Sequence, residues 1–147
     1  MTGLAFNTAF SAPYGEVATL SPLVRRVLAP NPGPFTFRGT GVYIAGGREV
    51  AVIDPGPLMA PHLEALKCAL EGLTVTHILI THTHADHSPA ARAVKDWTGA
   101  VVCASAQPAK DEGEPVEEGF DRNFVADRTV RVPTVGSSRS SVVSRRR

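Results

Sequence analysis

The sequence predicts an α/β domain with a mixed β-sheet and flanking helices. Short apolar segments follow one another between residues 23 and 53, as expected of neighbouring strands. Two segments of helical periodicity then alternate with two further apolar segments, the order expected of strand–helix–strand units. The 147 residues, 43% of them hydrophobic and 20% charged, suffice for one core and are too few for two.

The first predicted elements are three strands that form a meander. Leu23–Leu28 follows an unpatterned start and ends at a Pro- and Gly-rich cluster. Val42–Ala45 is joined to Glu49–Ile53 by a tight turn at Gly46-Gly47. The apolar run of the third strand indicates burial on both faces, and the meander ends at Asp54-Pro55-Gly56.

A helix is predicted at Pro61–Glu71. Leu63, Leu66 and Leu70 share one face at this spacing, and a proline suits the first helical turn. The following segment, Val75–Ile80, is apolar enough to be a buried strand.

A second helix is predicted to begin at Ser88, with this residue as N-cap and Pro89 at the first helical position. It should end near Gly99 and be followed by a short strand at Ala100–Cys103. Its periodicity directs three residues toward the core: Ala91, Val94 and Trp97.

The C-terminal third has weaker patterning. Residues 107–119 are acidic and contain Pro and Gly, which predicts a solvated loop, and Arg128–Val132 is the last candidate strand. From Thr134 the chain is rich in Ser and Arg and lacks apolar periodicity. We therefore expect a domain over residues 1–133 and a disordered tail over residues 134–147.

Charge, cysteine content and hydropathy restrict the class of protein. Four of the 15 basic residues lie in the tail, which has no acid, so eleven basic residues face 14 acidic ones elsewhere. Two cysteines, Cys68 and Cys103, suit a reducing compartment. The start MTGLAFNTAF lacks the basic beginning and long apolar run of a signal peptide, and no apolar stretch approaches the roughly 20 residues of a membrane span. A soluble, cytoplasmic protein without a membrane partner is expected.

The residues that indicate chemistry lie directly after the Val75–Ile80 strand, in the sequence Thr81-His82-Thr83-His84-Ala85-Asp86-His87. Residues two apart in an extended segment point the same way, so His82 and His84 can bind one metal ion. Asp86 and His87 follow a turn and can address a second point nearby. Mixed histidine and carboxylate ligands suit zinc, with Mn²⁺ or Fe²⁺ as substitutes. A hydrogen-bonded turn without metal is the alternative, but it would crowd three imidazoles at the carboxyl end of a buried strand.

The segment THTHADH resembles the HxHxDH signature of the metallo-β-lactamase superfamily. Val50–Gly56 resembles the family's strand ending in Asp-x-Gly, and Asn31–Tyr43 resembles a lactamase-like, glyoxalase II-like subgroup. The resemblance covers residues 25–99 and continues more weakly to about Val132. It implies the N-terminal half of an αββα fold, so residues 1–133 would be a partial domain. The family includes thioesterases, lactamases, phosphodiesterases and ribonucleases.

The resemblance also implies roles for individual residues. His82 and His84 would bind a first zinc ion, and Asp86 and His87 a second, with Asp86 as the catalytic residue that orients the bridging water. Zinc would lower the pKa of that water, and the resulting hydroxide would attack an ester, thioester, amide or phosphodiester of a small-molecule substrate. Asp54 would support the metal-binding loop by hydrogen bonds. An Asx turn before Pro55-Gly56 explains Asp54 equally well.

Other candidate residues are assigned structural roles. Thr81 and Ser88 are expected to be structural, and Arg25-Arg26 to form a solvated strand face. His62 is expected at an exposed helix start and His77 at a strand end. Cys103 is expected to be a small buried hydrophobic residue.

The family pattern also expects a further histidine, a bridging aspartate and a final histidine, but this sequence has no histidine after His87. Catalytic zinc sites normally have three protein ligands. We therefore expect a truncated or frame-shifted chain that is weakly active or inactive. The alternative is a non-catalytic remnant with an incomplete metal site. Two further expectations are self-association through an exposed sheet face and nucleic-acid binding through the Arg-rich tail.

Overall fold

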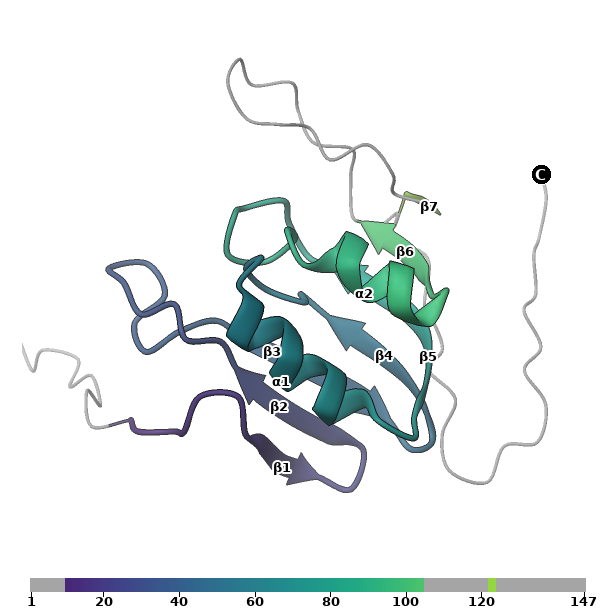
Figure 1. The fold of residues 1–147 in the computed structure, drawn as a ribbon, viewed down its shortest axis with the longest axis horizontal. Helices are drawn as coiled ribbons and strands as arrows, with labels where there is room; N and C mark the ends of the chain where they lie inside the picture. Colours follow the sequence, from purple (N-terminus) through teal and green to yellow (C-terminus); the bar gives the residue numbers. More distant parts are fainter. Residues whose placement is uncertain (1–9, 105–121, 124–147) are drawn as a thin grey trace, which may run out of the picture.

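Seven strands and two helices make up the part of the chain that the computed structural model describes, residues 10–104 and 122–123 (Figure 1). In chain order they are β1 (Val17–Ser21), β2 (Val24–Leu28), β3 (Gly41–Gly46), β4 (Glu49–Ile53), α1 (Ala60–Leu70), β5 (Thr74–Ile80), α2 (Ala91–Thr98), β6 (Val101–Ala104) and β7 (Arg122–Asn123).

The strands form one mixed sheet in which spatial order follows chain order, from β1 to β7. The first four strands pair antiparallel as a meander. From β4 onward the pairing is parallel. Helix α1 carries the chain back between β4 and β5, and α2 carries it back between β5 and β6. The carboxyl ends of β4, β5 and β6 therefore lie along the same edge of the sheet.

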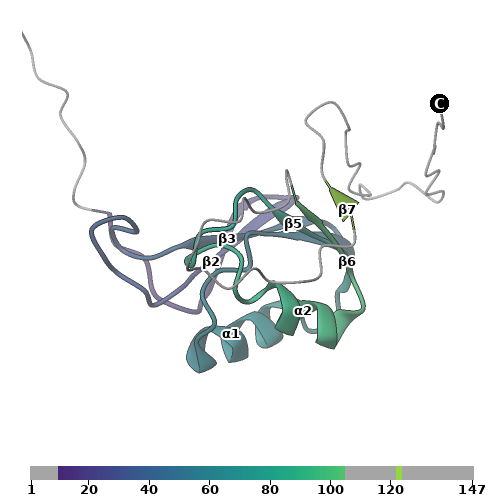
Figure 2. The ribbon, with the colours of Figure 1, turned by 90° about the horizontal axis from the view of Figure 1, so that it is seen from above.

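Both helices pack on the same face of this sheet (Figure 2). The core lies between them and the strands and consists mainly of branched aliphatic side chains. Its largest fully buried members include Ile44, Leu66 and Ile78. The predicted α/β class with a mixed sheet and flanking helices is confirmed.

No helix or strand within residues 10–104 and 122–123 covers the opposite face of the sheet. Because side chains alternate along a strand, the paired residues that flank the core positions point to this face. One such row crosses the sheet through Arg26, Tyr43, Ile53, Leu79 and Cys103. Tyr43 is 38% exposed, whereas Cys103 is buried as predicted. We call this surface the open face.

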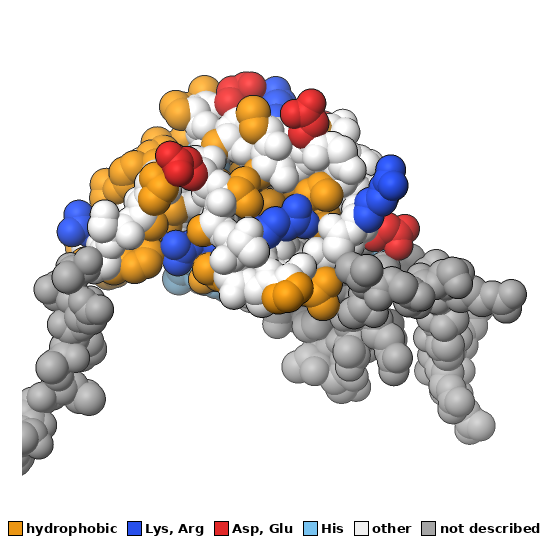
Figure 3. All heavy atoms as spheres, turned by 90° about the horizontal axis from the view of Figure 1, so that it is seen from below, with side chains coloured by type: hydrophobic (Ala, Val, Ile, Leu, Met, Phe, Trp, Pro, Cys, Tyr) orange, Lys and Arg blue, Asp and Glu red, His pale blue; other side chains and the backbone are white. Residues whose placement is uncertain are grey.

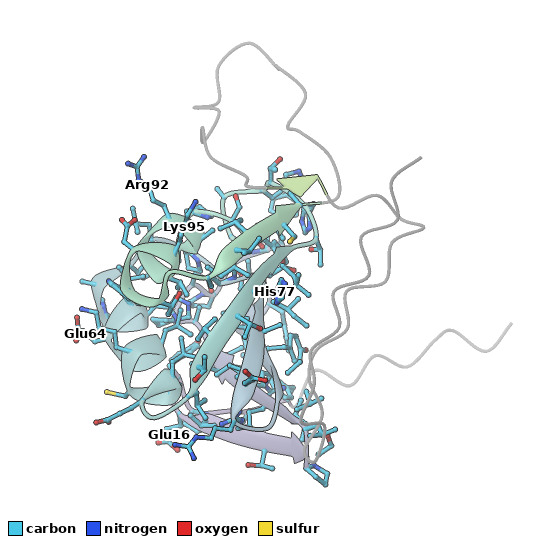
Figure 4. The ribbon with its side chains drawn as sticks, turned by 90° about the vertical axis from the view of Figure 1, so that its right-hand side faces the viewer. Glu16, Glu64, His77, Arg92 and Lys95 are labelled. Carbon is cyan, nitrogen blue, oxygen red and sulfur yellow. The ribbon has the colours of Figure 1, made fainter. Side chains whose placement is uncertain are left out.

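His77 also lies on the open face, in the middle of β5 (Figure 4). It is paired with Ala51 of β4 and Val101 of β6, and its Nδ1 lies 3.0 Å from Thr76 Oγ1. The prediction that it ends a strand is wrong. It lies within the strand, whereas the histidines of the motif lie in the polar loop that follows Ile80.

The edge strand β1 was not predicted from the sequence. Its residues show no apolar alternation, and Val17 and Leu20 are about half exposed. The view of the molecule from below shows hydrophobic side chains interspersed with charged side chains of both signs (Figure 3). A strand that buries little on either face leaves no periodic signal, so pairing with β2 decides its conformation.

The buried face of α1 differs from the predicted one. His62, Leu66 and Leu70 are buried, whereas Leu63 is half-buried. The prediction that His62 is exposed is therefore wrong. The inward face follows an i, i+4, i+8 spacing and places an imidazole where a leucine was expected.

The second helix begins later than predicted. α2 starts at Ala91, its N-cap residue is Ala90, and no side chain caps it. Ser88 is buried in a turn, in which its carbonyl accepts a hydrogen bond from Ala91 N at 2.9 Å. The predicted capping by Ser88 is wrong because this turn joins the polar loop before the helix starts. Trp97 is 38% exposed and lies beneath Lys67 Nζ, so its assignment to the core is also wrong.

Several predictions fall outside the described residues. These are the loop at 107–119, the strand at Arg128–Val132 and the disordered tail at 134–147, and they stay predictions, as does nucleic-acid binding through the tail. Neither helix in the described part of the chain is long and apolar enough to cross a membrane.

Candidate metal centre

The candidate site lies where the parallel strands β4 and β5 end side by side, with Ile53 paired to Leu79. A polar segment leaves each strand at this edge. Asp54 follows β4 and starts a turn through Pro55 and Gly56, and residues 81–88 follow β5. We call the first segment the Asp54 turn and the second the histidine loop. Their proximity follows from the parallel pairing, because carboxyl ends of adjacent parallel strands share one edge.

Asp54 joins the two segments through its side chain. Its Oδ1 accepts a hydrogen bond from Thr81 N at 2.7 Å. Its Oδ2 accepts from Thr81 Oγ1 at 2.6 Å and lies 3.1 Å from His87 Nδ1. The residue is 7% exposed and has a φ of 47°, a backbone conformation that costs non-glycine residues energy. These contacts with residues far along the chain offset that cost.

Backbone hydrogen bonds join the same two segments. Gly56 N donates to His87 O at 2.8 Å, and Ala90 N donates to Gly56 O at 3.0 Å. Within the histidine loop, His87 N donates to His84 O at 2.9 Å. The Asp54 turn and the histidine loop are thus held together by main chain as well as by side chain.

The three imidazoles of the histidine loop are close to one another. The ring centroids of His82 and His84 are 4.8 Å apart with an edge-to-face angle of 82°, and those of His82 and His87 are 4.0 Å apart. His82 and His84 are exposed, whereas His87 is half-buried. The structure therefore gathers the predicted site residues at the end of β5.

The proton inventory around Thr81 indicates which nitrogen of His82 can bind a ligand. The Thr81 hydroxyl has one proton, which it donates to the acceptor-only carboxylate of Asp54. His82 Nδ1 lies 2.9 Å from the same hydroxyl oxygen, so Nδ1 carries the proton of this contact. In this tautomer His82 Nε2 has a free lone pair directed away from Thr81.

His87 lies between two carboxylates. Its Nδ1 is 3.1 Å from Asp54 Oδ2, and its Nε2 is 3.2 Å from Asp86 Oδ2. A neutral imidazole has one proton, so it can donate to one of these acceptors and faces the other with a lone pair. A second proton or a cation between Nε2 and Asp86 removes that conflict. The pair His87–Asp86 therefore fits a bound cation, while Asp54 accepts the proton of Nδ1.

Potential ligand atoms gather at this site among the described residues: one atom each of Asp54, His82 and His87 lies within 4.8 Å of the other two. His84 lies beside this group, against the His82 ring, and Asp86 lies against His87. Imidazole nitrogens with carboxylate oxygens form a donor set that suits zinc. The residues present thus fit a zinc ion.

His62 is a residue of this region that the sequence did not reveal. It is fully buried at the start of α1, and its Nε2 lies 2.8 Å from Pro55 O in the Asp54 turn. Burial lowers the pKa of His62 below its ordinary value, although the contact with Pro55 O opposes this. The carbonyl can only accept, so Nε2 carries the proton of the neutral ring. The sequence signal for its burial was its spacing, because His62 lies four residues before the buried Leu66 on the same face of the helix.

Comparison with known proteins places this geometry in a family. The sequence model of the metallo-beta-lactamase superfamily matches residues 36–143, which include both the Asp54 turn and the histidine loop. The chain belongs to this superfamily. The resemblance that THTHADH indicated is confirmed at this level. The superfamily match also extends past Pro133 into the Ser- and Arg-rich segment.

Three curated proteins illustrate the similarity. A lactamase-like protein of Pestalotiopsis microspora is 43% identical over 79 residues, which are 52% of this chain and 25% of that protein. An atrochrysone carboxyl ACP thioesterase of Passalora fulva is 41% identical over 76 residues, 50% of this chain and 23% of that protein. A beta-lactamase-like protein 2 homolog of Caenorhabditis elegans is 30% identical over 126 residues, 83% of this chain and 42% of that protein. The chain thus spans about a quarter of the two fungal proteins and under half of the nematode one.

Two solved structures share the fold. The BLEG-1 B3 metallo-beta-lactamase superposes with a TM-score of 0.56 at 23% identity, over 75% of this chain and 56% of that one. ETHE1 from Myxococcus xanthus superposes with a TM-score of 0.53 at 25% identity, over 76% of this chain and 44% of that one. This chain corresponds to the N-terminal part of the metallo-beta-lactamase fold.

Proposed function

We propose that this chain carries the zinc-binding loop of a hydrolase that cleaves a small-molecule ester or thioester. The observation that carries the proposal is the position of His87 between Asp54 and Asp86. A metal-ligating histidine usually donates its other ring proton to a carboxylate, which fixes its tautomer and raises its basicity. Asp54 accepts the Nδ1 proton of His87 and leaves Nε2 for the metal.

The proposed ligands are those of the signature motif: His82 and His84 for one zinc ion, Asp86 and His87 for a second. Asp54 supports them, because its two oxygens already accept from Thr81 N, Thr81 Oγ1 and His87. Bound zinc would supply a water activated near neutral pH and would polarise a carbonyl oxygen. Asp86 is the proposed catalytic residue, since its half-buried carboxylate can accept a proton from that water and orient it.

The substrate class rests on the relatives. The protein of Passalora fulva that is 41% identical to half of this chain is an ACP thioesterase. An activated water attacks the carbonyl carbon of a thioester more readily than an amide or a phosphodiester. Cys68 and Cys103 are not joined in a disulfide, which supports a reducing compartment such as the cytoplasm.

The second candidate function is a non-catalytic domain, and the donor set favours it for the chain on its own. The sequence has no histidine after His87, so each of two ions would have two of the proposed ligands. Catalytic zinc normally has three protein ligands and an open position. Under this alternative the 147-residue protein binds zinc weakly and does not turn over substrate.

Equilibrium dialysis against zinc and hydrolysis of a short acyl thioester separate the two candidates. A hydrolase loses turnover in His87→Ala and in Asp86→Asn, whereas His77→Gln, on the open face, serves as the control and keeps it. A non-catalytic chain gives the same background rate for all four proteins. Zinc that binds tightly at two ions per chain would contradict the incomplete donor set and would require ligands from elsewhere.

Self-association through the open face is a further part of this proposal. Tyr43, Ile53 and Leu79 form a partly exposed apolar row in the middle of that face. Each 100 Å² of apolar surface removed from water contributes about 2.5 kcal/mol. Size-exclusion chromatography should show a dimer or larger species that Tyr43→Lys disperses, and a concentration-independent monomer would contradict it.

A further inference from the structure

The strongest unassigned feature is the contact between α1 and the Asp54 turn. His62 is fully buried, and its Nε2 lies 2.8 Å from the carbonyl oxygen of Pro55. Pro55 follows Asp54 and precedes Gly56, and both of these neighbours bond directly to the histidine loop. His62 therefore contacts the residue that lies between the two members of the Asp54 turn that bond to the loop.

The turn is shaped around this imidazole. Gly56 has a φ of 89°, and a Cβ at this position would lie 2.8 Å from His62 Nε2. Such a distance is too short for any residue other than glycine unless the ring moves. The close approach of ring and backbone keeps the Pro55 carbonyl within hydrogen-bonding distance of Nε2.

A role in filling space does not explain a histidine here. His62 Nδ1 is buried and has no hydrogen-bond partner among residues 10–104 and 122–123. An unsatisfied buried acceptor destabilises the fold, whereas a leucine or methionine of similar size would leave no polar atom unpaired. The histidine therefore lowers stability through its unpaired Nδ1, and the contact between Nε2 and Pro55 O offsets this loss of stability.

We propose that His62 is a positioning residue of the metal centre: its Nε2–H holds the Pro55 carbonyl, and thereby fixes the direction in which Asp54 meets Thr81 and His87. This inference rests on the proposed function insofar as it concerns zinc. It extends that function by assigning a role to a residue on a helix outside the signature motif. His62 touches neither the metal nor the substrate and acts through the Asp54 turn.

The test uses two substitutions of nearly equal size in the full chain, His62→Gln and His62→Met. A glutamine amide can donate to Pro55 O, and a methionine cannot. Zinc affinity is measured by competition with a chromophoric chelator, and hydrogen exchange is measured at the amide of Thr81, which donates to Asp54. Leu66→Ala, equally buried on the same face of α1, controls for lost stability.

The expected result is a loss of about tenfold in zinc affinity for His62→Met, with His62→Gln within about threefold of the original protein. Thr81 exchange should be faster in the methionine variant alone, and Leu66→Ala should lower Tm without changing zinc affinity. Equal zinc affinity and equal Thr81 exchange in the Gln and Met variants would overturn the proposal. If the original protein binds no zinc, the proposed function fails, and Thr81 exchange still decides whether His62 positions the turn.

Discussion

The Asp54 turn and the histidine loop meet at one edge of the sheet but differ in burial. Asp54, Pro55 and Gly56 are buried, and His62 lies fully buried beneath them. In the histidine loop, His82 and His84 are exposed and Asp86 and His87 are half-buried. Each proposed ligand is thus on the exposed side, and the groups that orient them are on the buried side.

This difference divides stability from chemistry. The polar groups of the buried turn are paired with the histidine loop and with His62, so changes there should alter the free energy of unfolding. The exposed loop keeps ring nitrogens accessible, so changes there should alter ligand binding with little effect on unfolding. Substitutions on the two sides should therefore differ most in their effect on stability.

The largest effect is expected for Gly56→Ala. The added Cβ would meet His62 Nε2 at 2.8 Å, and the residue has a φ of 89°. Crowding and left-handed strain together should lower the free energy of unfolding by about 3 kcal/mol. Urea denaturation measures this loss in the free energy of unfolding. Gly72→Ala is the matched control, because Gly72 has a φ of 73° but no atom within 4 Å of its Cβ, so it should lose about 1 kcal/mol. Equal losses would mean that the ring gives way freely.

A smaller loss is expected for Asp54→Asn. The amide cannot accept all three hydrogen bonds that Thr81 and His87 make with the carboxylate. Loss of charge-assisted bonds in a buried setting should cost about 2 kcal/mol in thermal or urea unfolding. Asp96→Asn, an exposed position on α2, should change stability by less than about 0.5 kcal/mol. An Asp54 variant as stable as the control would show that the network stabilises nothing.

His62 should make stability pH-dependent. Burial lowers its pKa, so below about pH 6.5 the unfolded chain binds a proton that the folded chain excludes. Stability is therefore present above pH 6.5 and decreases as pH falls toward the folded-state pKa, by at most about 1.4 kcal/mol per pH unit. Unfolding of the original protein and of His62→Gln is compared at pH 7.5 and pH 5.5. The variant should lose less stability on acidification, and an equal or larger loss would contradict a buried neutral ring.

The smallest effect on stability is expected for His84→Ala. The side chain is exposed, and its contact among the described residues is the edge of the His82 ring. Unfolding should change by less than about 0.5 kcal/mol, while zinc affinity decreases. A loss of 2 kcal/mol or more would show that the exposed loop is itself structural.

The elements with strong periodicity were predictable within a residue or two. β4 was predicted at its observed bounds, and β2, β3, β5, β6 and α1 within one residue at either end, because each buries apolar side chains at a regular spacing. The sequence did not predict β1, whose conformation is fixed by pairing with β2. It also did not predict where α2 begins, because the turn at Ser88 precedes the helix. Tertiary contacts decide both.

The site was predictable in its residues and not in its connections. His82, His84, Asp86 and His87 are adjacent in sequence, so their proximity follows from the motif. The bonds from Asp54 reach 27 and 33 residues along the chain, and local sequence left an Asx turn equally plausible. His62 was missed because its partner is a backbone carbonyl, which no side-chain pattern records.

The most direct test of the zinc-binding loop is a zinc titration followed by NMR of the histidine side-chain nitrogens. The chain has five histidines, of which His77 lies on the open face and serves as the internal control. Zinc should shift the ring nitrogens of His82, His84 and His87 together, with a dissociation constant of about 1 μM or weaker, and leave those of His77 unchanged. Shifts at His77, or no shift in the loop up to millimolar zinc, would contradict a metal centre at this edge of the sheet.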